Sequence, residues 1–156
     1  MSQKMERFTP AARRVLSLSQ EEAERLHHSE INIGHLLLGL LREHESIAAQ
    51  VLGDVGTSLD AAEKVVRDAY LKEPASTQAH PIELADDIKK LLELTVDEAR
   101  RQGHQIIAPE HMLLGLVRYQ STWPDLFEAL DLDSEIVRQE TTSLMTLYDY
   151  SHIPVE

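Results

Sequence analysis

The chain has 156 residues, of which 42% are apolar, 27% charged and 4% aromatic, with no cysteine and a formal net charge of −12. This composition is typical of a folded domain with an aliphatic core, and it excludes disulfides, thiolate catalysis and cysteine-bound metals. The negative charge disfavours nucleic acid and anionic membranes as partners and suits a cationic or amphipathic polypeptide. Because the start MSQK lacks the apolar stretch of a signal peptide and no window reaches the length of a membrane span, we expect a cytoplasmic protein.

The sequence contains an internal duplication. Residues 13–42, RRVLSLSQEEAERLHHSEINIGHLLLGLLR, align at a shift of 76 with residues 89–118, KKLLELTVDEARRQGHQIIAPEHMLLGLVR. Both segments carry EAxR followed by HxLLGLxR, and beyond residue 118 the shift becomes 75. The pattern predicts a first repeat over residues 5–71, a linker over 72–82, a second repeat over 83–147 and a tail over 148–156.

Each repeat is expected to form four helices. In the first repeat, Thr9 caps a helix that has Pro10 at its first position and runs to about residue 28. Asn32 caps the second helix, whose LLLGLL run is too apolar for a surface helix and is expected to be central. A short third helix covers residues 46–52, and Ser58 caps a fourth that reaches about residue 71.

The second repeat follows the same pattern, with Pro109 starting its buried helix, a short helix over residues 123–130 and Asp133 as the last cap. Gly39 and Gly115 lie in the middle of the buried helices, and we interpret them as points of close helix–helix approach. The predicted fold is all-α: an eight-helix, pseudo-twofold duplication of a four-helix repeat, packed into one body.

Motifs of enzyme chemistry are missing. The sequence has no GxxxxGK(S/T), no GxSxG and no HExxH, so we expect no ATPase, no catalytic residue and no cofactor. Glu24-x-x-His27 matches half of a di-iron pattern, but the equivalent residues 100–103, RRQG, offer no ligand, so no metal site is expected. His35 and His111 are expected to form hydrogen bonds inside the core near helix starts.

Four acidic residues occur at equivalent positions of the two repeats. We expect them on exposed helix faces, because their spacing suits solvation and nothing points to a cleft; they are Glu21, Glu22, Asp97 and Glu98.

The repeats resemble a known family. ERFTPAARRVLSLSQEEAERLHH followed by GHLLLGLLRE is similar to the start of the N-terminal domain of ClpA/ClpC unfoldases, and APEHMLLGL resembles its second Clp repeat. The resemblance covers about residues 5–147. It implies a domain that docks adaptor or substrate polypeptides for a Clp ATPase/protease, with no nucleic-acid or membrane partner.

In ClpC-like members the resemblance also implies binding of proteins phosphorylated on arginine. Each site takes a threonine from an RFT motif and a glutamate from a GTEH motif. The first repeat keeps Thr9 but has Gly34 at the glutamate position, and the second keeps Glu110 but has Ala85 at the threonine position, followed by two aspartates. We therefore expect a retained docking surface with two degraded phosphoarginine sites.

The expected docking surface lies near the starts of the first and fifth helices. Its residues are Arg7, Phe8, Thr9, Gly34, Leu84, Ala85 and Glu110. Because the end TLYDYSHIPVE contains no Gly/Ser-rich linker, we expect a stand-alone accessory subunit or decoy of the Clp system rather than an excised domain. The alternative is a small-ligand or stress-response protein with a pocket between the repeats.

Overall fold

The computed structural model describes residues 6–69, 82–119, 124–148 and 150. Eight α-helices lie within these residues, four in each repeat. The first repeat consists of α2 (Pro10–Arg25), α3 (Ile33–Arg42), α4 (Ile47–Asp54) and α5 (Leu59–Ala69). The second consists of α6 (Asp86–Arg101), α7 (Pro109–Tyr119), α8 (Pro124–Ala129) and α9 (Ser134–Thr146). The predicted all-α duplication is confirmed.

The helix starts follow the predicted capping residues. Thr9 Oγ1 accepts the Ala12 N–H at 3.1 Å, and Pro10 is the first residue of α2. The side chains of Asn32, Ser46 and Asp133 accept backbone N–H groups at the starts of α3, α4 and α9. The first helix ends at residue 25 rather than 28. The predicted linker lies outside the described residues except for residue 82, as do residues 70–71, Trp123 and most of the tail.

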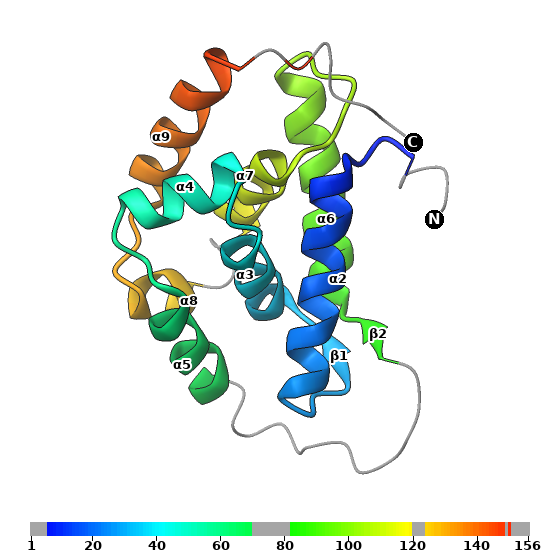
Figure 1. The fold of residues 1–156 in the computed structure, drawn as a ribbon, viewed down its shortest axis with the longest axis vertical. Coiled ribbons are helices and arrows are strands. Elements are labelled where there is room, and N and C mark those ends of the chain that lie inside the picture. Colours follow the sequence, from blue (N-terminus) through cyan, green and yellow to red (C-terminus); the bar gives the residue numbers. More distant parts are fainter. Residues whose placement is uncertain (1–5, 70–81, 120–123, 149, 151–156) are drawn as a thin grey trace.

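The helices α3 and α7 form the centre of the molecule, with the other helices around them (Figure 1). Every residue from Ile33 to Leu41 and from Pro109 to Val117 is buried. A fully buried leucine stabilises the fold by about 1.5–3 kcal/mol relative to an exposed one. The apolar HxLLGLxR segment therefore places both helices inside the core, as predicted.

The packing between the repeats is reciprocal. Helix α2 of the first repeat contacts α7 of the second, and α6 of the second contacts α3 of the first. In the same way α4 packs on α9, and α5 packs on α8. Each of these four contacts has a counterpart with the repeats exchanged, which is the pattern of a pseudo-twofold arrangement.

Two short parallel strands, β1 (Glu30–Ile31) and β2 (Glu83–Leu84), join the repeats beside α2 and α6 (Figure 1). Their register places Glu30 next to Glu83 and Ile31 next to Leu84. Strand signals in the sequence are weak, because a two-residue strand is too short to show alternation.

Candidate functional site

The segment that leads into α2 pairs with the second repeat. Phe8 forms a parallel bridge with Ile107, the Thr9 N–H donates to the Ile107 carbonyl at 2.9 Å, and the Ile107 N–H donates to the Arg7 carbonyl at 2.9 Å. The Arg7 side chain donates from Nε to the Gln105 carbonyl at 2.9 Å. Phe8 is buried in the core. The start of α2 is therefore fixed next to the segment that leads into α7.

An equivalent junction forms at the start of α6. Leu84 pairs with Ile31 in the β1–β2 ladder, and the Ala85 N–H donates to the Ile31 carbonyl at 2.9 Å. Ile31 is followed by α3, whose second residue is Gly34. The two junctions match through the duplication, since Phe8 and Leu84 occupy equivalent positions.

The junctions bring together, across the repeats, residues expected from the resemblance to belong to docking sites. Thr9 of the first repeat lines the same pocket as Glu110 of the second, whereas Ala85 lies beside the strand that leads to Gly34. The expected pairing of Thr9 with Gly34 and of Ala85 with Glu110 is therefore wrong. One junction holds both the threonine and the glutamate, and the other holds neither.

The pocket at the first junction, here called the α2–α7 pocket, has a volume of about 340 Å³. It lies between the starts of α2, α4 and α7. The residues that give it its chemical character are Thr9, Arg14, Ile47, Glu110 and Tyr148. Tyr148 is 45% exposed, so the pocket offers an accessible aromatic surface beside its polar groups.

Glu110 and Glu45 are the acidic residues of this pocket, and Glu110 is the buried one, at 4% exposed. The Tyr150 hydroxyl donates to Glu110 Oε2, and the carboxylate also accepts the N–H of its own residue. Burial raises the pKa of Glu110, and these two hydrogen bonds act in the opposite direction. The carboxylate is thus a desolvated acceptor held by neighbouring donors.

The second junction has a different electrostatic character. Asp87, in the first turn of α6, accepts backbone N–H groups of Ile33 and Ile88, and burial raises its pKa. Its carboxylate accepts hydrogen bonds from N–H groups at the starts of both α3 and α6. These N–H groups are therefore not open to a bound anion. A groove of about 360 Å³ lies nearby, lined mainly by Leu16, Ile31, Leu84 and Leu92. This junction therefore presents apolar surface and acidic groups rather than an anion site.

Each repeat contains a contacting pair of histidines, one of which, His35 or His111, is fully buried. His35 Nε2 lies 2.8 Å from His28 Nδ1, and His35 Nδ1 accepts the Asn32 N–H at 3.0 Å. In the second repeat His111 makes the same contacts with His104, at 2.8 Å, and with the Ala108 N–H, at 2.9 Å. Because each Nδ1 accepts a backbone N–H, the proton is on Nε2 and donates to the partner histidine. The predicted core role of these histidines is confirmed.

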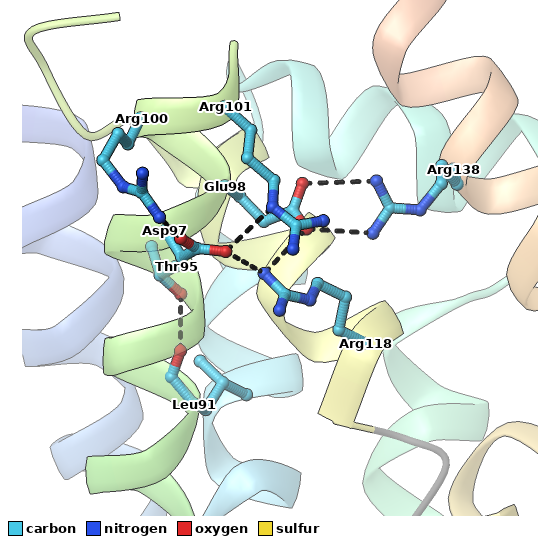
Figure 2. A network of polar contacts seen from close by, with 8 residues as sticks. All are labelled: Leu91, Thr95, Asp97, Glu98, Arg100, Arg101, Arg118 and Arg138. Atoms are coloured by element: carbon cyan, nitrogen blue, oxygen red, sulfur yellow. Dashed lines mark hydrogen bonds and ion pairs between the residues drawn. The ribbon is translucent and has the colours of Figure 1, made fainter. Parts of the chain in front are cut away.

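Two of the acidic residues expected on exposed faces are buried. Glu22 is 2% and Glu98 is 1% exposed, so the prediction is wrong for both. Figure 2 shows Glu98 between Arg118, which reaches it at 3.2 Å, and Arg138 of α9, whose two guanidinium nitrogens lie 3.2 Å from its oxygens. Glu22 pairs in the same way with Arg42 at 2.9 Å. The arginine that ends HxLLGLxR therefore binds a buried glutamate in both repeats.

The charge balance around these glutamates differs between the repeats. In the second repeat Arg100, Arg101 and Arg118 all contact Asp97, which lowers the pKa of that carboxyl group (Figure 2). Arg138 occupies the position equivalent to Glu63, and Glu63 instead binds Arg25 at 2.6 Å in the first repeat. Equivalent helices are thus linked by ion pairs of different composition.

Within the described part of the chain, no three histidine, aspartate or glutamate side chains converge in a geometry that could hold a metal ion. Nor is any described helix both long and apolar enough to cross a lipid bilayer.

Sequence reasoning missed three contributors to the α2–α7 pocket. Tyr148 and Tyr150 come from the segment treated as a tail, and Ile47 comes from the start of the short helix α4. Two tyrosines close together in TLYDY were the available signal, because aromatic residues are scarce in this chain.

Comparisons with known proteins agree on one family. The family model described as the Clp repeat (R) N-terminal domain matches residues 7–130 and 89–147. The Bacillus subtilis protein "Negative regulator of genetic competence ClpC/MecB" is 44% identical over 112 residues, which are 72% of this chain and 14% of that protein. This chain therefore spans about a seventh of the length of that relative.

Solved structures show the same fold. The N-terminal domain of the chaperone ClpD from Arabidopsis thaliana aligns with a TM-score of 0.75 and 23% identity, over 91% of this chain and 96% of that one. A ClpV N-domain solved in complex with a VipB peptide aligns with a TM-score of 0.71 and 13% identity, over 93% and 91% of the two chains. With the duplication, the matching family model and these structures in agreement, this chain belongs to the Clp repeat N-terminal domain family.

Proposed function

We propose that this chain is a protein-binding module of a Clp ATPase/protease system, and that it docks adaptor or substrate polypeptides through the α2–α7 pocket. The observation that carries this proposal is the convergence of Thr9 and Glu110, from different repeats, in one pocket of about 340 Å³. The site residues Arg7 and Phe8 hold the start of α2 in place for this pocket.

The pocket suits a polypeptide side chain that is cationic. The Glu110 carboxylate is an acceptor for a guanidinium or ammonium group, and a charge-assisted hydrogen bond of this kind is stronger than a neutral one. Thr9 caps α2, so the positive end of that helix faces the same space and favours an anionic atom. A phosphoarginine side chain carries both kinds of group. The chain has one complete threonine–glutamate pair, so we expect one such site and none at Gly34 and Ala85.

The remaining support comes from charge and from relatives. A net charge of −12 attracts cationic polypeptides at long range. The solved ClpV N-domain of the same fold binds a peptide, VipB, which favours polypeptide docking by this fold. The groove that includes Leu84 offers a second, apolar contact surface for the same partner.

Calorimetric titration with free phosphoarginine and with arginine-containing peptides tests the proposal. We expect saturation at one site per chain, and loss of at least tenfold in affinity for Glu110→Gln, because the ion pair is lost while the shape of the side chain is kept. Glu83→Gln, an exposed change at the other junction, is the matched control and is expected to bind as the wild type does. Binding at two sites, or equal binding by the two variants, would contradict the assignment.

The role within the Clp system is a further part of this proposal. As an accessory subunit or decoy in the cytoplasm, the chain would hold ligands that an unfoldase also recognises. An excess of the chain is then expected to slow degradation of an arginine-tagged substrate by a reconstituted Clp protease, and Glu110→Gln is expected to relieve that effect. Native mass spectrometry addresses the alternative of a small-ligand protein, since a retained small molecule would support it.

A further inference from the structure

A residue close to the C-terminal end of the chain lies on the carboxylate of the α2–α7 pocket. The Tyr150 hydroxyl donates to Glu110 Oε2, although the two residues are 40 positions apart. The Tyr150 ring stacks at a tilt on His104, with 4.4 Å between ring centroids, and lies 5.9 Å from the ring of His111. Tyr148 packs edge-on against the Tyr150 ring, with 4.9 Å between ring centroids, and lines the pocket. Tyr150 is thus held by one hydrogen bond and three rings.

This contact determines how the carboxylate is satisfied. Glu110 is 4% exposed, and a carboxylate removed from water needs hydrogen-bond donors to remain charged. Tyr150 supplies one of those donors. A carboxylate oxygen accepts more than one hydrogen bond, but this carboxylate is only 4% exposed and has few open approaches, so a docking donor that reaches Oε2 competes with the phenol for it.

We propose that Tyr150 is an internal competitor for the docking site: in the unbound chain its hydroxyl occupies the place of a ligand's donor on Glu110, and it leaves when a cationic polypeptide binds. This inference rests on the proposed function, since it concerns the same pocket. It assigns Tyr150 an autoinhibitory role that sets the threshold for binding.

The exchange has a simple energetic form. The apparent affinity of a ligand equals its intrinsic affinity multiplied by the fraction of molecules in which the site is open. A guanidinium group makes a charge-assisted pair with Glu110, whereas the phenol is a neutral donor, so a cationic ligand displaces Tyr150 more readily than a neutral one does. Burial and the neighbouring Glu110 raise the pKa of Tyr150 above its ordinary value, so the phenol keeps its proton and remains a donor at neutral pH. The contact therefore selects against uncharged ligands.

The test uses the full chain and a capped 12-residue peptide with arginine at every third position, compared with the same peptide carrying citrulline. Tyr150→Phe removes the hydroxyl and keeps the ring on His104, and Tyr150→Ala removes both. We expect the arginine peptide to bind about tenfold more tightly to Tyr150→Phe, in line with one hydrogen bond to a charged group, and at least as tightly to Tyr150→Ala. Tyr119→Phe, which removes a phenol at the end of α7, is the control and is expected to bind like the wild type.

A second measurement follows the tyrosine itself. With ¹³C-labelled tyrosine rings, the NMR signals of Tyr150 are expected to move toward those of a solvent-exposed tyrosine as the arginine peptide is added, while those of Tyr119 stay in place. In Glu110→Gln the Tyr150 signals are expected to differ from the wild type even without peptide, since their hydrogen-bond acceptor has changed.

The outcomes separate the two levels of inference. If the arginine peptide binds equally to the wild type, Tyr150→Phe and Tyr150→Ala, the competitor role is overturned and docking at the pocket stands. If the arginine peptide binds no better than the citrulline peptide to any of these proteins, docking at Glu110 fails, and the competitor role fails with it. Tighter binding by both Tyr150 variants that is lost again in Glu110→Gln/Tyr150→Ala supports both.

Discussion

Gly39 lies so close to Ser19 that a Cβ on the glycine would come within 2.5 Å of Ser19 Oγ and 2.6 Å of the Val15 carbonyl oxygen. The second repeat has the same relationship, with 2.5 Å from a Cβ on Gly115 to Thr95 Oγ1. A small residue at this position lets the buried helix approach the first helix of its own repeat. The duplication has kept this contact, which explains why the glycine interrupts each apolar run.

Gly39→Ala is expected to destabilise the protein by about 1–3 kcal/mol, because the added methyl overlaps a backbone oxygen that belongs to α2 and cannot turn away. The change should be visible in urea unfolding as a lower midpoint with an unchanged slope. Gly53→Ala is a matched control in α4, since nothing lies within 4 Å of its added Cβ. The control is expected to gain about 0.5–1 kcal/mol from helix propensity, and a stabilised Gly39→Ala would show that the helices are not in contact there.

The buried histidines are expected to make stability depend on pH. Burial lowers the pKa of His35 and of His111 to about 3, with smaller contributions from His28 and His104 respectively. Below pH 6.5 the unfolded chain takes up protons on these residues and the folded chain does not, so the free energy of unfolding falls as the pH falls from 6.5 toward 3. Each histidine contributes up to about 1.4 kcal/mol per pH unit in that range.

Urea unfolding at pH 7, 6 and 5 measures this dependence above the range in which ordinary carboxyl groups titrate. His35→Gln/His111→Gln should be less stable at pH 7 but should show a shallower dependence on pH, since it lacks the two titrating groups. An equal dependence in the wild type and the variant would contradict the neutral, buried state of these rings.

Glu98→Gln is expected to cost about 2–3 kcal/mol, because Arg138 then faces a neutral group at a buried position and Arg118 keeps only Asp97 (Figure 2). Thermal and urea unfolding provide the measurement. Asp68→Asn removes an exposed partner of Lys64 and is the control, with an expected change below about 0.5 kcal/mol. Similar losses in both variants would mean that burial of Glu98 does not strengthen its ion pairs.

Glu83→Lys is expected to stabilise the protein by about 0.5 kcal/mol, because it places a cation beside Glu30 in the β1–β2 register, where two like charges now meet. Asp86 and Asp87 lie close by in α6 and favour the same change. The gain should shrink in 0.5 M salt, which screens exposed charges. A gain that salt leaves unchanged would point to β-propensity rather than charge.

The sequence predicted the fold well because its signals are local or repeated. Thr9, Asn32 and Asp133 act on N–H groups two or three residues away, and the caps were correctly placed at each. Burial of the HxLLGLxR helices followed from composition alone. The duplication then supplied the architecture, since two copies of one amphipathic unit bury their apolar faces most simply against each other.

The site could not be predicted to the same degree, because its contacts join distant parts of the chain. Pairing of Thr9 with Glu110 depends on the bridge to Ile107, and no local pattern shows which repeat a two-residue strand will join. Glu98 looks like a surface residue until Arg138, 40 residues later, is seen to reach it. The two tyrosines of TLYDY indicated a contact but not that Tyr150 would reach Glu110.

The crossed junctions have a structural implication for how such a molecule can be assembled. Each half contributes the edge that its neighbour lacks, as Phe8 does for Ile107 and Leu84 does for Ile31. Two separately expressed halves, divided between residues 72 and 81, carry matching surfaces and should recombine into one complex on mixing. A single ancestral unit could make the same contacts with a second copy of itself. The contacts between the two covalently joined repeats are thus arranged like those of a symmetric homodimer.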